Sequence, residues 1–182
     1  MKRRSLILLT LLAVFCQTAL AQEDFKPITV FVVRHVEKEN EPKQDPPLTK
    51  EGVARSQELA RVLASANIKA IYTSQFARTK LTAEPLATKT GLTVTPLTLK
   101  PNLSNLKLIA EESTNELISK ILQRPGESVL VIGHSNWIPD VIKMLGGDTV
   151  PTIDEQKFDD LFIVTVYAKG KAKVVQLKYG AP

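Results

Sequence analysis

The two histidines of this 182-residue chain occupy equivalent positions, each directly after an apolar run. His35 follows residues 28–33 and Arg34, whereas His134 follows residues 128–132 and one glycine. Imidazole is the side chain best suited to act as an acid, a base or a nucleophile near neutral pH. A histidine that merely ends a strand is a common structural feature, but the repetition of this arrangement predicts one shared chemical site.

Two arginines accompany the histidines. Arg34 directly precedes His35, and Arg78 lies shortly after another predicted strand. Guanidinium groups match the oxygens of a phosphate, and nearby positive charge keeps an imidazole neutral, with a lone pair free to attack phosphorus. The alternative for Arg78 is a solvated helix position, as we expect for Arg55 and Arg61. Together, the two arginines and two histidines predict binding of a dianionic phosphate.

Short β-branched runs alternate with amphipathic segments along the chain. Strands are predicted at residues 28–33, 69–73, 92–97, 128–132, 161–167 and 172–179. One helix is predicted to begin at about residue 49, a second to run through residues 83–87, a third to lie within residues 102–123 and a fourth to cover residues 138–145. This alternation predicts an α/β fold, a three-layer α/β/α sandwich with a mostly parallel central sheet and a C-terminal antiparallel hairpin. Because the carboxyl ends of parallel strands form the ligand crevice of such sheets, both histidines should open onto the same edge.

Several features near this edge carry expectations of their own. Pro85 is expected to kink or interrupt the second helix, which Gly91 should end. The loop at residues 38–47 and the segment 102–113 are expected to set specificity, because loops around a rigid sheet commonly carry binding residues. Trp137 is expected to pack on the sheet rather than to stack on a substrate.

The first 21 residues are typical of a secretory signal peptide. Three basic residues at positions 2–4 precede an apolar run, and residues 19–21 have the small-x-small pattern of a cleavage site. The run is shorter than the ~20 residues that a membrane-spanning helix needs. We therefore expect cleavage after Ala21, no stable membrane insertion, and a single mature domain of residues 22–182 that is exported to the periplasm or secreted.

Composition narrows the class of protein further. The chain is 43% hydrophobic and 24% charged, which suits one globular domain, and its single cysteine cannot form a disulfide within the chain. Loss of residues 1–21, which hold three basic and no acidic side chains, would lower the formal net charge from +5 to +2. A nearly neutral domain gives no electrostatic reason to expect a nucleic-acid partner.

Four segments carry the candidate residues, in this order: Arg34-His35-Val36-Glu37, Leu48-Thr49-Lys50-Glu51-Gly52, Tyr72-Thr73-Ser74 with Arg78-Thr79 and Thr82-Ala83, and Gly133-His134-Ser135-Asn136. The first resembles the Arg-His-Gly/Ala-Glu signature of the histidine phosphatase superfamily, the phosphoglycerate mutase-like clan (branch 1 type). The others are similar to its Leu-Thr-x-x-Gly segment, its second-arginine block and its late Gly-His segment. Four motifs in the family's order are far more specific than one Arg-His dipeptide.

The resemblance implies a role for each matched residue. His35 would be the catalytic nucleophile and form a phosphohistidine that water then hydrolyses. Arg34, Arg78 and His134 would bind the phosphate and take part in catalysis. The resemblance also implies a small phosphorylated substrate or a phosphorylated macromolecule, and no metal or organic cofactor, because positioning and electrostatic stabilisation do most of the work in phosphoryl transfer.

The chain departs from the family at the acid that protonates the leaving group. Many relatives place an acidic residue between the second arginine and the late histidine, but residues 96–108 contain none. Others carry aspartate directly after the late histidine, where this chain has Ser135. Glu37 is the nearest candidate by sequence, either as the acid or as an orienting residue paired with Arg34 or Arg78. Without an acid, good leaving groups such as phosphohistidine or acyl phosphates would be favoured.

Two classes of function remain open. The leading hypothesis is an exported phosphatase that acts on a phosphomonoester or a similar phosphorylated group through His35. A mutase is less favoured, since it must hold its substrate in two orientations. The alternative class is a phosphate-binding module of the same fold with little or no turnover, which the missing acid motivates.

Overall fold

The computed structural model describes residues 25–100, 111–149 and 151–180. Its elements are β1 (Ile28–Arg34), α2 (Lys50–Val62), β2 (Ile68–Ser74), α3 (Ala77–Thr90), β3 (Val94–Leu97), α4 (Glu111–Leu122), β4 (Ser128–Gly133), α5 (Ile138–Met144), β5 (Asp160–Ala168) and β6 (Lys171–Lys178). The predicted signal peptide lies outside the described residues, as do residues 102–110 of the expected specificity segment 102–113. No helix within the described ranges is long and apolar enough to cross a membrane.

The strands form one sheet in the order β3-β2-β4-β1-β5-β6. Strands β3, β2, β4 and β1 run parallel to one another, whereas β5 runs antiparallel to β1 and β6 runs antiparallel to β5. The predicted parallel sheet with a C-terminal antiparallel hairpin is therefore confirmed. The order places β4 between β2 and β1, so three strand ends that carry candidate residues lie side by side.

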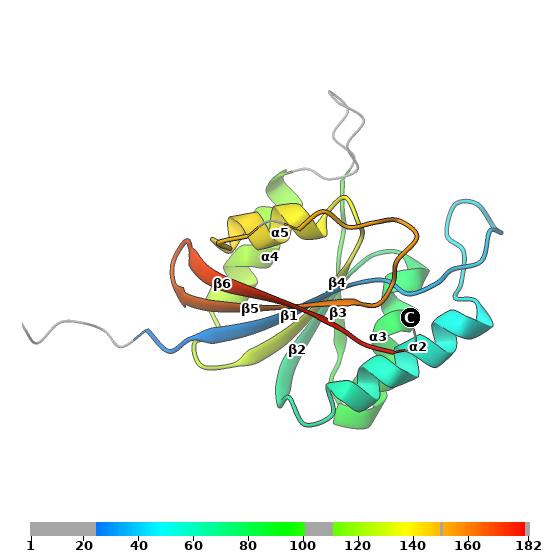
Figure 1. Cartoon of the computed structure of the whole chain (residues 1–182), viewed down its shortest axis with the longest axis horizontal. Coiled ribbons are helices and arrows are strands. Elements are labelled where there is room, and N and C mark those ends of the chain that lie inside the picture. Colours follow the sequence, from blue (N-terminus) through cyan, green and yellow to red (C-terminus); the bar gives the residue numbers. More distant parts are fainter. Residues whose placement is uncertain (1–24, 101–110, 150, 181–182) are drawn as a thin grey trace, which may run out of the picture.

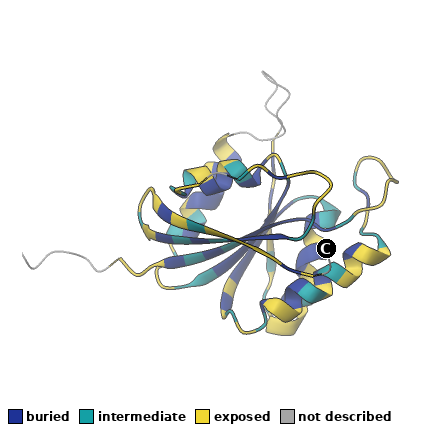
Figure 2. Ribbon diagram, in the orientation of Figure 1, coloured by how far each residue is buried: buried dark blue, intermediate teal, exposed yellow. Residues whose placement is uncertain are grey.

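Helices cover both faces of the sheet. Figure 1 shows α4 and α5 on one side and α2 and α3 on the other. Successive residues of β4 serve the two layers, since Val129 and Val131 belong to the core under α4 and α5, whereas Leu130 and Ile132 belong to the core under α2 and α3. In Figure 2 the central strands are buried, whereas the outer faces of the helices are exposed. This arrangement is the predicted three-layer sandwich.

The start of α2 is fixed against the chain that follows β1. Thr49 is the N-cap residue, and its side-chain oxygen accepts a hydrogen bond from the Gly52 N–H at 3.1 Å. A Cβ atom on Gly52 would collide with the main-chain carbonyl of Glu37. The Leu-Thr-x-x-Gly segment thus combines a helix cap with a glycine that allows close approach, and both hold α2 next to the site.

Pro85 does not interrupt the second helix. Pro85 lies inside α3, which continues from Ala77 to Thr90 without interruption. The core contacts of its buried face, which includes Leu86, offset the hydrogen bond that proline cannot donate. Gly91 ends the helix in the left-handed conformation, as predicted. The Leu92 N–H then donates to the Ala87 carbonyl at 3.1 Å and so belongs to the helix end. Strand β3 begins at Val94, two residues later than expected.

Candidate active site

Three adjacent strand ends bring the two histidines together. The His35 N–H donates to the Gly133 carbonyl at 2.9 Å, which extends the β1–β4 ladder by one bond. The ring centroids of His35 and His134 lie 5.4 Å apart. Ser74, the last residue of β2, lies on the other side of β4, with its Oγ atom 2.9 Å from His134 Nε2. The shared edge expected from the sequence is therefore present.

The His35 ring is held in one tautomer by the chain itself. Its Nδ1 atom lies 2.8 Å from the Val36 carbonyl oxygen, which can only accept a hydrogen bond. The proton of the neutral ring must therefore reside on Nδ1, so Nε2 carries the lone pair. A neutral imidazole with a free Nε2 is the form that can attack phosphorus.

Arg34 is oriented by a segment more than 100 residues away in the sequence. Its Nη1 atom donates to the main-chain carbonyls of Asp154, Glu155 and Lys157, at 3.2, 2.7 and 3.2 Å. The guanidinium carbon also lies 4.3 Å from the centre of the Phe158 ring, in a cation–π contact. One nitrogen of the fork is thus used for positioning, which fixes the direction of the others.

Arg78 reaches the site from the first turn of α3. Its guanidinium carbon lies 4.3 Å from the centre of the Phe76 ring, and that ring packs edge-on against His134 at 5.5 Å between centroids. Asp45, from the loop at residues 38–47, lies 3.8 Å from Arg78 Nη1. Both oxygens of Asp45 also accept the Ala77 N–H, at 2.8 and 3.0 Å, which supplies the cap that α3 lacks locally.

Two buried donors at the site have no partner. Among the described residues, the buried side-chain polar atoms without a hydrogen bond are Arg34 Nε, Arg78 Nε and the Tyr179 hydroxyl. An unsatisfied buried donor on a charged group costs ~1–3 kcal/mol or more. Two such guanidinium donors beside two imidazoles are suited to an anion with several oxygens, as phosphate is.

Burial and positive charge keep both rings neutral. Burial, followed by the charges of Arg34 and Arg78, lowers the pKa of His35 to about 4, against the raising effect of its bond to Val36. Burial, then Arg78, His35 and Arg34, lowers the pKa of His134 to about 3. Burial also lowers the pKa of both guanidinium groups, but arginine remains charged. The site therefore holds two fixed cations and two neutral bases at neutral pH.

These low values predict how stability depends on pH. An unfolded histidine titrates near pH 6.5, so between that value and pH 3–4 the unfolded chain binds protons that folded His35 and His134 do not. The free energy of unfolding should fall as the pH drops through this window, by about 2–3 kcal/mol for each histidine. Denaturant unfolding at pH 7 and pH 4 measures it. A His35→Asn/His134→Gln double variant should lose less stability than wild type; an equal loss would contradict the assignment.

Asp45 is expected to weaken phosphate binding, because its carboxylate competes for Arg78. In Asp45→Asn, the amide oxygen can still cap α3, but the charge is removed. We expect inorganic phosphate to bind up to about 5-fold more tightly to this variant, a modest effect because the ion pair is partly exposed. Asp45→Ala, measured alongside, should also lose about 1 kcal/mol of stability with the cap. Weaker binding to Asp45→Asn would show instead that the carboxylate positions Arg78.

Glu37 pairs with a different arginine from the two expected. Its carboxylate binds Arg55 of α2, with Arg55 Nε at 2.8 and 3.1 Å from the two oxygens and Nη2 at 2.8 Å. Arg55 also donates to the Tyr179 carbonyl at 3.3 Å, so it is a structural link and not a solvated helix residue. The capped start of α2 places Arg55 against Glu37. Glu37 thus forms its ion pair with Arg55 and not with Arg34 or Arg78, whereas Arg61 is exposed, as expected.

Three residues at the site were not found from the sequence. Arg34 is held by Phe158 and by the carbonyls around Glu155, which lie more than 100 residues later in the sequence. No local sequence pattern in that segment indicates a contact with Arg34. Asp45 had a weak signal, as an acidic residue in the proline-rich loop before the second-arginine block. Trp137 is fully buried and donates to Thr114 Oγ1 at 3.0 Å, in agreement with its expected packing role.

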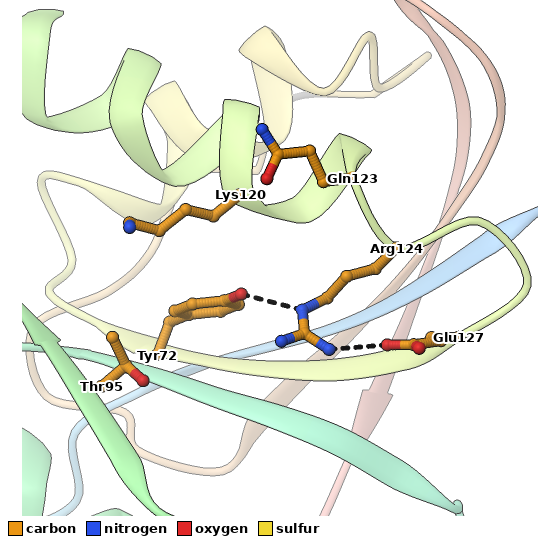
Figure 3. Close-up of a pocket in the computed structure, with 6 residues that line it drawn as sticks. All are labelled: Tyr72, Thr95, Lys120, Gln123, Arg124 and Glu127. Carbon is orange, nitrogen blue, oxygen red and sulfur yellow. Dashed lines mark hydrogen bonds and ion pairs between the residues drawn. The ribbon is translucent and has the colours of Figure 1, made fainter.

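A pocket in the described part of the chain lies apart from these residues. It has a volume of about 440 Å³, and Figure 3 shows its lining: Tyr72, Thr95, Lys120, Gln123, Arg124 and Glu127. Arg124 donates to the Tyr72 hydroxyl at 3.0 Å and pairs with Glu127 at 2.7 Å, so its charge is already balanced. Across the described ranges, no group of three or more His, Cys, Asp or Glu side chains is placed to hold a metal ion.

Comparison with known families agrees with this geometry. The profile of the histidine phosphatase superfamily (branch 1) matches residues 30–120, which include most of β1, the start of α2 and the Arg78 segment. The chain belongs to this superfamily. Arg34, His35 and Arg78 lie within the matched range of this histidine phosphatase superfamily member, and His134 directly follows β4. Membership supports phosphatase or mutase chemistry in general.

Several solved structures share the fold of this chain. The protein histidine phosphatase SixA, complexed with tungstate, is 22% identical with a TM-score of 0.64, over 82% of this chain and 96% of that one. Phosphoglycerate mutase from Bacillus anthracis is 17% identical (TM-score 0.64; 85% and 94% covered). Phosphoserine phosphatase from Entamoeba histolytica is 14% identical (TM-score 0.60; 85% and 98% covered). Comparison with curated protein sequences gave no match.

Proposed function

We propose that this protein is an exported phosphatase that hydrolyses a phosphorylated small molecule or macromolecule through a phosphohistidine on His35. The observation that carries the proposal is the pair of buried, unpartnered guanidinium donors, Arg34 Nε and Arg78 Nε, beside a histidine with a free Nε2. Two forked cations can hold a phosphoryl group, and a neutral imidazole can attack it. The export part of the proposal depends on the composition of residues 1–21 alone.

The proposed reaction has two steps. In the first, the Nε2 lone pair of His35 attacks phosphorus while the bond to the leaving group breaks, and the two guanidinium groups offset the charge on the phosphoryl oxygens. In the second, water attacks the phosphohistidine and releases inorganic phosphate and neutral His35. His134, whose Nε2 is held by Ser74, gains a proton more readily once a dianion binds, and then donates to a phosphoryl oxygen.

The test compares the rate of phosphate release with the affinity for inorganic phosphate. The mature protein is incubated with an aryl phosphate and with a phosphohistidine peptide, and released phosphate is measured alongside the affinity for inorganic phosphate. Release from at least one substrate, lost in His134→Ala and in His35→Ala, is the expected result. Tight phosphate binding with no release from either substrate would support the phosphate-binding module instead. The phosphohistidine peptide is included because SixA is described as a protein histidine phosphatase.

A further inference from the structure

Hydrolysis of an alkyl phosphate requires a proton for the leaving oxygen, because an alkoxide is a poor leaving group. Among the described residues around the site, three carboxylates are already engaged. Glu37 pairs with Arg55, and Asp45 caps α3 and pairs with Arg78. Asp154 accepts the Gln156 N–H at 2.9 Å within its own turn. These carboxylates are therefore poorly suited to carry a transferable proton.

Glu155 is held in a different way. Its main-chain carbonyl accepts Arg34 Nη1 at 2.7 Å, which ties its backbone to one phosphate-binding residue. Its side-chain Oε1 lies 3.3 Å from the hydroxyl of Ser135, the residue that directly follows His134. Glu155 is thus attached by its backbone to one side of the site and by its side chain to the other.

The surroundings of Glu155 suit exchange of a proton with a bound substrate. The residue is exposed, and its side-chain partner is a neutral hydroxyl, which can accept or donate a hydrogen bond. A protonated and an ionised carboxyl group can therefore both be held by Ser135. Glu155 also exerts the largest single-charge effect on Arg34, which places its carboxylate close to the guanidinium.

From this geometry we propose that Glu155 is the catalytic proton donor for phosphate esters and that Ser135 is its positioning residue. The inference depends on the proposed function. As the bond from His35 Nε2 to phosphorus forms and the ester P–O bond breaks, the Glu155 carboxyl proton passes to the leaving oxygen and an alcohol departs. The Glu155 carboxylate then takes a proton from the water that attacks the phosphohistidine, so the acid is restored. Alkyl phosphomonoesters are accordingly substrates.

The test compares leaving groups. Glu155→Gln, Ser135→Ala and wild type are assayed with p-nitrophenyl phosphate, whose leaving group needs little protonation, and with β-glycerophosphate, an alkyl phosphate. In Glu155→Gln, kcat should fall about 100-fold on the alkyl ester and less than about 3-fold on the aryl ester. Ser135→Ala should show a smaller loss, again confined to the alkyl ester. Glu84→Gln, which changes an exposed carboxylate on α3, is the control and should match wild type.

The outcomes separate this inference from the proposed function. Equal losses on both esters in Glu155→Gln, or no loss on the alkyl ester, would overturn the role of Glu155 alone. Wild type that hydrolyses the aryl ester but not the alkyl ester would overturn it as well. Wild type that releases phosphate from neither ester nor from a phosphohistidine peptide would overturn the proposed phosphatase itself.

Discussion

Replacing His35 with asparagine is expected to lower kcat by about 10⁴-fold or more, because the variant lacks the nitrogen that attacks phosphorus. The fold should be retained, since the asparagine side-chain N–H can donate to the Val36 carbonyl as Nδ1 of His35 does. Turnover of p-nitrophenyl phosphate under saturating conditions measures the loss.

Phosphate binding provides the control for this variant. The guanidinium groups of Arg34 and Arg78 are untouched in His35→Asn, so inorganic phosphate should bind within about 10-fold of wild type. Lost turnover with retained binding assigns His35 to the chemical step. A His35→Asn protein that keeps a tenth or more of wild-type turnover would contradict a nucleophilic role.

Replacing Arg34 with lysine is the second large effect that we expect, despite the conserved charge. Three carbonyls converge on Nη1 of Arg34, while Nε remains for an anion. Lysine has one ammonium group, whose three N–H donors all lie on the same nitrogen. It therefore cannot donate both to the carbonyls and to a bound anion as the arginine fork can. We expect kcat/KM to fall about 100-fold or more, with a loss of about 1–3 kcal/mol in the free energy of unfolding as carbonyls lose their donor.

Steady-state kinetics and denaturant unfolding measure the two effects of Arg34→Lys separately. Arg61→Lys is the matched control, because Arg61 lies on the exposed face of α2 with 70% of its side chain accessible. That variant should match wild type in both measurements. An Arg34→Lys protein within about 3-fold of wild type in kcat/KM would show that charge alone, and not the forked donor, is what the site uses at this position.

The parts of the structure that the sequence predicted well are those with local causes. Short, nearly continuous apolar runs marked β1 and β4 to within one residue, and parallel pairing then placed His35 beside His134. The helix start expected at about Thr49 was correct to within one residue, and Gly91 marked a helix end through its capping role. Pro85 does not interrupt α3, and this outcome depends on packing against the core, which a local pattern does not contain.

The sequence indicated the histidines and arginines of the site but not the residues that orient the arginines. The residue types of Arg34 and Arg78 indicated phosphate, and the structure brings both to the histidines. Their orientation depends on contacts between distant segments, such as Phe158 against Arg34 and Asp45 against the start of α3. Such contacts follow from the way loops fold over the sheet edge, for which neither hydrophobic periodicity nor turn chemistry gives a signal.

The central claim, that the phosphoryl group passes through His35, is tested most directly by trapping the intermediate. Wild type and His35→Asn are mixed with a phosphoryl-labelled substrate, denatured at alkaline pH during turnover, digested and mapped. The account predicts an acid-labile label on the wild-type peptide that contains His35 and none in the variant. A label on another residue, or turnover by His35→Asn at the wild-type rate, would contradict it.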